Sequence, residues 1–420
     1  MTTVAYIANE FPSPLEPYVM DEISELRRRD VKVVCCSGKR VSPHELSLAE
    51  RAFWKETRFF QPLTDERLMQ AAHRLASDRR KLWQLLRPLL SPVGGSSTLR
   101  LRALGHTLMG SALAEELAPL EIQHIHAHHG YFASWMAQVA ARLLGIGFSF
   151  TLHGSDLLRR GDLLAAKLEA CRFCVTVSDF NRDYILQTYP STPPNKIVVQ
   201  RLGVDRVLSW PTDSHPTVTG GRPFCLLAVG RLHRVKDFEF LIEACAALRA
   251  QGLDFLCWIV GEGPERPALE RQIAKLGLRH HVHLIGHVPR NELITYYRHA
   301  DLVVMTSKSE GIPVVLMEAM SHEKLVLAPA ITGIPELVDD RRSGFLYAPD
   351  SLSDFIHNIG WIHANQASLS EIRRAAADKV ATSYNRRRNL RAFADRFLTL
   401  IPHFGGDYAH PVLQQIRLSV

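Results

Sequence analysis

The chain has 420 residues, of which 46% are hydrophobic and 22% are charged. This length and balance indicate a globular protein of two or three domains and exclude a disordered, collagenous or coiled-coil chain. No run of about 18 apolar residues occurs, so no membrane-spanning helix is expected. The first residues enter an apolar strand directly, without the regions typical of a signal peptide, and we expect the protein in the cytoplasm.

The net charge of +7 is concentrated in one region of the chain. Residues 67–102 contain eight basic residues and one acidic residue, with leucines and Trp83 between them. A basic amphipathic stretch is typical of a helix that binds an anionic membrane surface. An ordinary solvated helix face is the alternative. Nucleic acid is not an expected partner, because no stacking motif or recognition helix accompanies the charge.

The seven cysteines are few and scattered along the chain. Cys171 and Cys174 form one Cys-x-x-Cys pair, but no second pair follows at the spacing of a zinc site. The cysteines are therefore predicted to be buried free thiols rather than a disulfide framework.

The first elements predict a parallel sheet flanked by helices. Residues 3–8 are a short apolar run, and residues 9–17 are a polar, proline-rich loop. Hydrophobic residues at helical spacing follow over 18–29, and 31–36 is a second strand-like run. The pattern continues with strands at 122–127, 148–152 and 173–177 and a helix at 131–144.

A second alternating series starts at residue 224, and helical patterns from 370 to 400 close the chain. The predicted strands of this series lie at 224–229, 255–260, 282–285, 302–306 and 325–329. The predicted helices lie at 238–251, 265–276, 291–299 and 313–321.

The two series predict an α/β protein with two tandem Rossmann-like, doubly wound domains. The first domain is expected at 1–205 and the second at 224–384. Residues 206–223 are rich in Pro, Gly and Ser and predict a linker. A helix at about 385–402 is expected to pack back on the first domain. Two such domains place a ligand cleft between them, outside the carboxyl ends of the strands.

Two glutamates flank a predicted helix start in the second domain. Glu310 precedes the helix, and Glu318 lies about one and a half turns inside it. Pro313 suits the first helical position, and Gly311 lets the backbone approach a ligand closely. The N–H groups at a helix start favour phosphate, whereas carboxylates on either side suit sugar hydroxyls. This segment predicts a site for a sugar phosphate.

Basic residues follow the first strand of the second domain. Gly230 permits a tight turn, and Arg231 and Lys236 offer a guanidinium fork and a point charge to a diphosphate. At the same edge of the sheet, Thr332 and Gly333 form another turn with available N–H groups. These loops together predict a diphosphate site.

The sequence lacks the motifs of several other nucleotide-binding and hydrolytic enzymes. The turn at 260–264 resembles the start of a dinucleotide fingerprint, but its third glycine is absent, so NAD binding is not predicted. Neither a P-loop, nor a nucleophile elbow, nor an Asp-x-Asp pair for a metal–nucleotide occurs. We therefore expect no metal and no cofactor.

His153 follows the predicted strand at 148–152 and precedes Gly154. A lone histidine is commonly a hydrogen-bonded structural residue. The strand-end position beside a glycine instead favours a side chain that faces the cleft.

Four further histidines lie in one short segment of the first domain. His124, His126 and His128 alternate and so share one face of a strand, and His129 follows them. No Cys, Asp or Glu stands at ligand spacing, so a metal site is not predicted. His128 and His129 are expected instead at the edge of an acceptor pocket.

These residues together resemble the retaining glycosyltransferases of family GT4, which have the GT-B fold. The resemblance is most specific over about 110 residues of the second domain and looser in the first. The His-Ala-His-His-Gly run at 126–130 resembles the transferases of exopolysaccharide and capsule assembly. The matching motifs are those at 229–232, Lys236, 260–264, 286–289, Glu310 with Glu318, 333–336, 152–156, 177–178 and 202–205.

The resemblance implies a UDP- or GDP-sugar donor bound by the second domain. It implies that Arg231 and Lys236 bind the diphosphate, that Glu318 binds the ribose hydroxyls and that Glu310 binds the donor sugar. His153 would contact that sugar from across the cleft. The remaining donor-binding positions that it implies are Gly230, Val288, Gly311, Ile312, Pro313, Thr332 and Gly333, with the loop around Val288 taking the base.

The implied reaction is transfer with retention to a lipid-linked or growing surface polysaccharide. Residues 67–102 are expected to hold the enzyme at the inner face of the cell membrane. Stabilisation of the diphosphate charge and domain closure would carry catalysis. One departure from the family is the loop at 9–17, which lacks the glycine pair of many members. Glu16 is expected to contact the acceptor there in place of backbone groups.

Two alternatives to this function stay open. One is a soluble transferase that acts on a small-molecule acceptor. The other is a protein that binds nucleotide sugars without turning them over.

Overall fold

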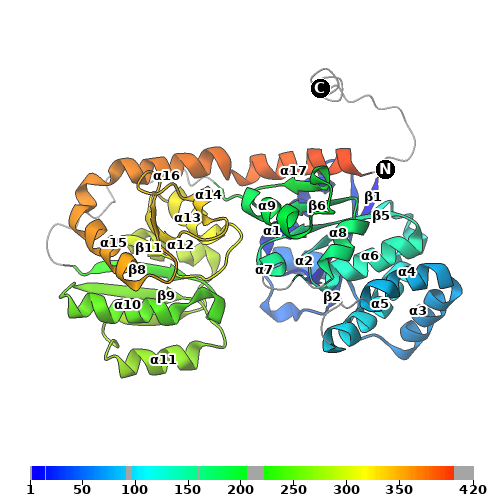
Figure 1. The fold of residues 1–420 in the computed structure, drawn as a ribbon, viewed down its shortest axis with the longest axis horizontal. Coiled ribbons are helices and arrows are strands. Elements are labelled where there is room, and N and C mark those ends of the chain that lie inside the picture. The colour runs from blue at the N-terminus through cyan, green and yellow to red at the C-terminus, as the bar shows by residue number, and fades with distance from the viewer. Residues whose placement is uncertain are drawn as a thin grey trace, which may run out of the picture. The chain divides into compact units, whose positions relative to one another are not determined.

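The computed structural model describes residues 2–14, 16–90, 97–158, 161, 163–205 and 222–401 (Figure 1). Its internal contacts divide the chain into two compact units. The first unit contains Met1–Thr151, Asp162–Cys174 and Phe393–Val420, and the second contains Leu152–Gly161 and Val175–Ala392. The domain boundaries drawn from the sequence stay a prediction, and most of the expected linker, 206–221, lies outside the described residues.

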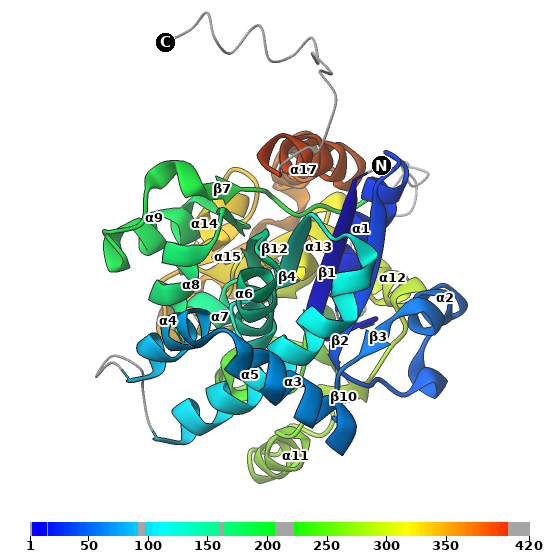
Figure 2. The same ribbon diagram turned by 90° about the vertical axis from the view of Figure 1, so that its right-hand side faces the viewer.

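The N-terminal sheet has seven strands in the order β3-β2-β1-β4-β5-β6-β7. Figure 2 shows strands β2, β1 and β4 of this sheet with helix α6 beside them. The pairs β3–β2, β2–β1, β1–β4 and β4–β5 are parallel. The order of the strands reverses between β1 and β4, because the chain runs from β1 to one side and returns to the other. The strands are β1 (Thr3–Glu10), β2 (Lys32–Lys39), β3 (Arg58–Phe59), β4 (His124–His128), β5 (Gly147–Leu152), β6 (Phe173–Thr176) and β7 (Ile197–Val199).

The central strands of this sheet are buried along most of their length, as is typical of parallel sheets covered on both faces. In the register between β1 and β4, Tyr6 lies opposite His126. The helices of this part of the chain are α1 (Pro17–Arg27), α2 (Leu48–Glu56), α3 (Asp65–Ser77), α4 (Arg79–Leu90), α5 (Ser97–Leu117), α6 (Phe132–Leu144), α7 (Ser155–Leu158), α8 (Leu164–Ala170) and α9 (Asp179–Thr188).

The second sheet repeats this topology with six strands in the order β10-β9-β8-β11-β12-β13. All of its neighbouring strands pair in parallel, and its order reverses between β8 and β11. The strands are β8 (Phe224–Val229), β9 (Phe255–Val260), β10 (Val282–Gly286), β11 (Leu302–Val304), β12 (Leu325–Pro329) and β13 (Phe345–Tyr347).

Alternate residues of these strands enter two separate cores. Leu226 packs in a core with α10, α11 and α15, whereas Leu227 packs on the opposite face with α12, α13, α14 and α16 (Figure 1). Because successive side chains of a strand point to opposite faces, both faces need apolar residues, and the strands are continuous apolar runs. The helices are α10 (Phe238–Ala250), α11 (Arg266–Lys275), α12 (Arg290–His299), α13 (Val314–Ser321), α14 (Ile334–Leu337), α15 (Leu352–Asn365) and α16 (Ser370–Ser383).

The two Rossmann-like sheets confirm the predicted fold class, and the strands at 224–229, 255–260 and 325–329 have the predicted bounds. Other predicted bounds differ from the structure, and two of these differences lie near the predicted donor site. Strand β11 ends at Val304 rather than at residue 306, and Pro313 is the N-cap of α13 rather than its first residue, with an extended ψ of 116°. The short strands β3, β7 and β13 were not predicted, because two or three residues carry no periodic signal.

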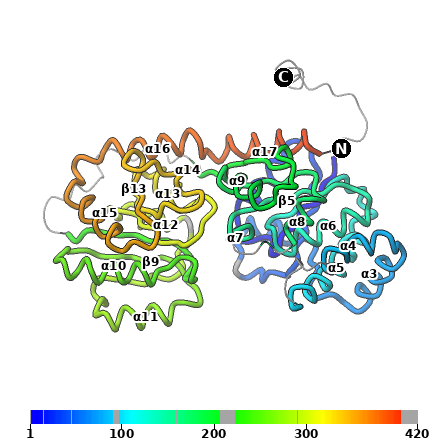
Figure 3. The backbone as a smooth tube through the Cα atoms, viewed as in Figure 1, coloured from blue at the N-terminus to red at the C-terminus, as the bar shows by residue number. Residues whose placement is uncertain are grey.

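Helices α3, α4 and α5 pack on one another and form the basic region of the first unit (Figure 3). Leu75, Leu85 and Leu89 are buried in this packing. The leucines of the basic stretch therefore pack within its own unit, which agrees with either reading of its basic face.

The last described helix, α17 (Arg386–Leu400), contributes Phe393 and Phe397 to the first unit. The ring of Phe397 lies 5.3 Å from the ring of His126 and 6.0 Å from that of Tyr6. All seven cysteines are buried free thiols, as predicted. Within the described residues, no helix is long and apolar enough to cross a membrane.

Candidate functional site

An ion pair joins two loops of the second unit where the order of its strands reverses. Lys236 ends the short helical turn η6 (Arg234–Lys236) after β8, and Glu310 lies in the loop after β11. The Lys236 Nζ lies 2.5 Å from Glu310 Oε1, and the two side chains are 23% and 13% exposed. In open α/β sheets, ligands bind in the crevice at this reversal point. The structure thus brings together two residues that are 74 positions apart in the sequence.

Glycines let the loops of this crevice pack backbone against backbone. A Cβ atom on Gly311 would lie 2.1 Å from the carbonyl oxygen of His153. A Cβ on Gly333 would lie 2.2 Å from the carbonyl oxygen of Gly311. No real Cβ tolerates such distances, so the close approach itself requires glycine at both positions.

Helix α13 begins beside the ion pair, and its first N–H groups have no acceptor within the helix. Pro313 precedes the first helical residue, and Ile312 is 5% exposed. The Glu310 N–H donates to the Thr332 hydroxyl at 3.4 Å, which ties the two loops together. A helix start of this kind is a ready site for an anion.

Glu318 lies inside α13, and its carboxylate accepts a hydrogen bond from the Tyr297 hydroxyl at 3.1 Å. Tyr297 is buried on α12, so the bond sets the direction in which the carboxylate points. The sequence analysis did not identify Tyr297, because nothing in the sequence pairs a tyrosine on one helix with a glutamate on the next.

His153 follows β5, and Asp156 fixes the turn that carries it. The Asp156 carboxylate accepts hydrogen bonds from the N–H groups of His153 and Gly154 at 3.0 and 2.9 Å. Asp156 is fully buried. It is the acid of the motif at 152–156, and the sequence analysis quoted it without assigning it a role.

The other predicted donor-site residues lie on the same edge of the sheet but make weaker contacts. Arg231 is exposed, and Val288 is half-buried after β10. A Cβ atom on Gly230 would lie in ordinary van der Waals contact with the aliphatic part of the Lys236 side chain, whose closest carbons are at 3.5 Å. Arg231, Lys236, Val288 and Glu310 follow strands of the second sheet, and of these residues Lys236 and Glu310 are in direct contact.

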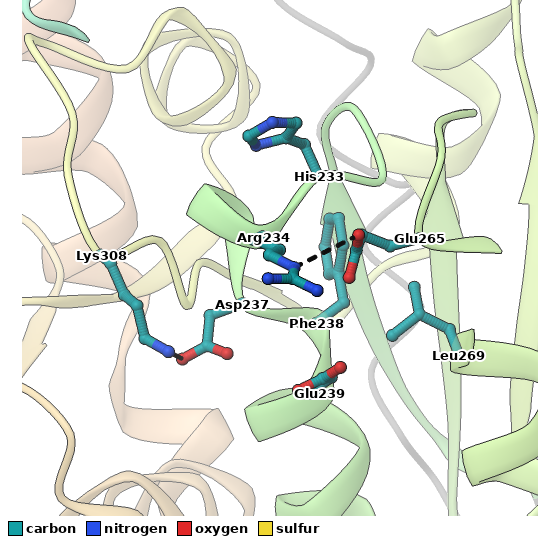
Figure 4. Close-up of a pocket in the computed structure, with 8 residues that line it drawn as sticks. All are labelled: His233, Arg234, Asp237, Phe238, Glu239, Glu265, Leu269 and Lys308. Carbon is teal, nitrogen blue, oxygen red and sulfur yellow. Dashed lines mark ion pairs between the residues drawn. The ribbon is translucent and has the colours of Figure 1, made fainter. Parts of the chain in front are cut away.

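A pocket of about 230 Å³ lies on the outer side of the Lys236 loop (Figure 4). Lys308 pairs with Asp237 at 3.0 Å, and this hydrogen bond raises the pKa of Lys308. Arg234 lies 3.6 Å from Glu265. The lining has two basic residues and three carboxylates, so the pocket is acidic and does not suit a diphosphate. Its lining residues are His233, Arg234, Asp237, Phe238, Glu239, Glu265, Leu269 and Lys308.

The first unit has its own pair of side chains at the reversal of its strand order. His129 follows β4, and Glu16 lies in the loop between β1 and α1. The His129 Nε2 lies 2.6 Å from Glu16 Oε1, and the side chains are 12% and 25% exposed. Both residues were predicted on the acceptor side, and the structure brings them into direct contact.

His128 does not lie at a pocket edge, and this part of the prediction was wrong. Its side chain is fully buried, and its Nε2 lies 3.1 Å from a carboxylate oxygen of Glu22 on α1. The sequence has no acidic residue at ligand spacing from these histidines, and Glu22 was too distant in the sequence to be recognised as a partner. One ligand atom each from Glu22, His126 and His128 lie within 4.8 Å of one another.

The buried histidines already have hydrogen-bond partners on the neighbouring strand. Ser149 Oγ lies 2.7 Å from both His124 Nε2 and His126 Nδ1, and Thr151 Oγ1 lies 3.0 Å from His126 Nε2. Burial lowers the pKa of His124 to about 3, with a smaller contribution from the charge of Arg172. This ladder of imidazoles and hydroxyls fits a structural role for His124 and His126.

Two family models cover most of the chain. The model of glycosyl transferases group 1 matches residues 212–379, and the model of glycosyltransferase family 4 matches residues 15–207. The ion pair of the second unit lies in the first match, and the pair of the first unit lies in the second.

Two curated relatives align over nearly their full length. The putative colanic acid biosynthesis glycosyltransferase WcaL of Escherichia coli is 26% identical, with 91% of this chain and 96% of the relative covered. The amylovoran biosynthesis glycosyltransferase AmsK of Erwinia amylovora is 25% identical, with 93% of this chain and 98% of the relative covered. Among solved structures, Anabaena Alr3699/HepE in complex with UDP-glucose has a TM-score of 0.68 at 17% identity, covering 95% of this chain and 100% of that one. This similarity supports the same two-sheet fold.

Proposed function

This chain belongs to the family 4 glycosyltransferases with the GT-B fold, and we propose that it transfers a sugar from a nucleotide diphosphate to a growing surface polysaccharide. The observation that carries the proposal is the Lys236–Glu310 pair beside the start of α13. A cation, a carboxylate and a helix start lie together here. Such a set of groups suits a ligand that has both a diphosphate and a sugar.

The diphosphate is best accommodated by the cationic part of this crevice. Lys236 and Arg231 supply positive charge, and the first turn of α13 supplies N–H donors. These groups oppose the charge that develops on the leaving diphosphate, which is where electrostatic catalysis acts. UDP and UDP-glucose occur in complexes of a protein with the same fold, which makes a uridine or guanosine diphosphosugar the natural class to test.

The sugar is best accommodated by the carboxylates. Glu310 and Glu318 stand on either side of the helix start, and His153 lies on a turn whose backbone contacts Gly311. In our proposal Glu310 binds the sugar, Glu318 binds the ribose, and the reaction retains the anomeric configuration, as the resemblance implies. Val288, Ile312, Pro313, Thr332 and Gly333 complete the donor site together with Gly230.

The acceptor is proposed to be a lipid-linked or growing saccharide bound at Glu16 and His129. The support is that two relatives aligned over their full length carry the names of exopolysaccharide enzymes. Direct contact between Glu16 and His129 at the edge of the first sheet agrees with such a site. Buried His128 would support this pair from the core rather than touch the acceptor.

The protein is proposed to lie at the inner face of the cell membrane, held by helices α3 to α5. Arg79 and Arg80 are exposed there, and Trp83 is 60% exposed. Leu101 is 70% exposed on α5. Exposed basic residues combined with exposed apolar ones suit an anionic bilayer surface.

The experiment that tests the function is nucleotide release from a panel of UDP- and GDP-sugars. The unaltered protein is compared with Glu310→Ala and Lys236→Ala. Slow hydrolysis of one donor that both substitutions abolish would support the transferase and identify the donor. If nucleotides raise the melting temperature but no sugar is turned over, even with a membrane extract as acceptor source, the protein is a nucleotide-sugar sensor instead.

A further inference from the structure

The loop after β4 contains a histidine in an unfavourable backbone conformation. His129 has a φ of 70°, in the left-handed region that costs a side-chain-bearing residue about 1 kcal/mol or more. Its N–H donates to the carbonyl of Thr151 on β5 at 2.9 Å. Such a conformation persists only where several contacts hold it, and it commonly marks a functional site.

A buried lysine holds the two residues that follow. Lys167, on α8, is 1% exposed. Its Nζ donates to the carbonyl oxygens of Gly130 at 2.6 Å and Tyr131 at 3.1 Å. An ammonium group is costly to bury, and an apolar side chain of similar length would fill the space without that cost. The lysine therefore specifies the position of this loop rather than adding to the stability of the core.

The end of the loop is held by a residue of strand β1 and a residue of helix α5. The N–H of Ala133, at the start of α6, donates to the side-chain oxygen of Asn9 at 3.2 Å. The ring of Phe132 stacks on His106 with centroids 3.9 Å apart. Contacts from β1, β5, α5 and α8 thus fix residues 129–133.

The fixed loop presents the imidazole of His129 to the carboxylate of Glu16. Their contact of 2.6 Å spans the point where the strand order reverses, the same topological place that the Lys236–Glu310 pair occupies in the second sheet. A carboxylate only accepts hydrogen bonds, so its remaining lone pairs suit hydroxyl donors and repel anions. The chemistry of this crevice is therefore that of an uncharged polyol.

We infer that Lys167 is a positioning residue for the acceptor: it fixes the 129–131 loop so that Glu16 and His129 receive hydroxyl groups of an uncharged sugar. This inference rests on the proposed function. It adds a residue that contacts neither donor nor acceptor, and it limits the acceptor sugar to one without a carboxylate or phosphate at the reacting end.

The test separates transfer from donor hydrolysis in the full-length protein. For the donor identified above, hydrolysis is measured without acceptor. Transfer is measured to octyl glucoside, octyl galactoside, octyl glucuronide and a membrane lipid extract. Lys167→Met is expected to lower the ratio of transfer to hydrolysis roughly 10- to 100-fold, because a misplacement of about 1 Å in a binding group costs that much.

Lys324→Met is the matched control. Lys324 is also a buried lysine, 6% exposed, and its Nζ donates to the carbonyl of Arg298 at 2.8 Å in the second unit. Its loss should lower transfer and hydrolysis by one common factor, through the folded fraction. His129→Asn serves if Lys167→Met does not fold, because asparagine tolerates the left-handed backbone while the imidazole is lost. It should lower the same ratio.

Three results would contradict the inference in different ways. If Lys167→Met lowers both rates by the same factor, as Lys324→Met does, then Lys167 is structural only. If the unaltered enzyme prefers octyl glucuronide to the neutral glycosides, the crevice does not select an uncharged sugar. If the unaltered protein hydrolyses no donor at all, the proposed function itself fails, and this result is distinct from the first two.

Discussion

The two sheets of this protein share a strand order but present different chemistry at the place where that order reverses. The second sheet offers a lysine–glutamate pair, a helix start and backbone groups packed through glycines. The first offers an imidazole–carboxylate pair on a loop that carries no glycine at 9–17. Close backbone packing through glycines is thus seen beside the pair of the second sheet, whereas side chains make the contact in the first.

This difference teaches that the scaffold determines where a ligand binds and the loops determine which ligand it is. Backbone N–H groups and cations suit a diphosphate, which is similar in every nucleotide sugar. Side chains suit an acceptor, whose hydroxyls differ from one polysaccharide to another. We expect the second crevice to tolerate few substitutions and the first to set specificity.

The largest effect is expected from the charge of Lys236. Lys236→Met removes the cation that faces the leaving diphosphate and leaves Glu310 without its partner, so donor turnover should fall by about 10²- to 10³-fold. Lys308→Met is the control, because Lys308 is an exposed lysine in the loop after β11 and pairs with Asp237, the residue that follows Lys236. Similar losses for both variants in the nucleotide-release assay would show that the loop, and not the charge of Lys236, is what matters.

A smaller but still large effect is expected from Gly311. Gly311→Ala would place a methyl group 2.1 Å from a backbone carbonyl, so the two loops must separate and donor turnover should fall roughly 10- to 100-fold. Gly360→Ala is the comparison. No atom lies within 4 Å of its Cβ position on helix α15, and the substitution should stabilise the protein by up to about 1 kcal/mol. Unchanged turnover in Gly311→Ala would show that the close backbone packing at Gly311 is not needed for donor turnover.

Binding of the first unit to an anionic membrane surface should depend on the positive charge of helices α3 to α5. Replacing Arg79 and Arg80 with glutamine should weaken binding to anionic vesicles by about 2 kcal/mol, since each basic residue near such a surface contributes about 1 kcal/mol. The difference should shrink as salt is added. The control neutralises Arg271 and Arg279, which are exposed in the second unit. Equal vesicle binding by the two variants in a sedimentation assay would argue against docking through α3 to α5.

The smallest effect is expected from His124 in the core of the first unit, and it concerns the free energy of unfolding. His124 has an ordinary pKa near 6.5 when unfolded but about 3 when folded, so below pH 6.5 only the unfolded chain takes up this proton. Stability is therefore lost as the pH falls through 6.5, and His124 contributes about 1 kcal/mol of that loss between pH 6.5 and 5.5.

His124→Gln should reduce this acid-dependent loss by a similar amount, measured by urea unfolding at the two pH values. His322, in the second unit, is the counterpart, because burial lowers its pKa to about 4 as well. An unchanged pH dependence in His124→Gln would mean that His124 is charged in the folded protein.

Most of the fold could be predicted from the sequence, because parallel strands buried on both faces are continuous apolar runs. The donor-side residues were also recognisable, since each follows a strand, and strands of a parallel sheet end at one edge. That reasoning located Lys236 and Glu310 on the same edge before any contact between them was known.

Only the tertiary structure decided which side chains meet. The contact of Glu16 with His129 and that of Glu22 with His128 each join residues more than 100 positions apart. Lys167 acts through two backbone carbonyls, and a hydrogen bond of that kind leaves no pattern in a sequence. Periodicity reports which face of an element is buried, whereas the partner of a buried polar group depends on how distant elements pack, and that information exists only in the folded chain.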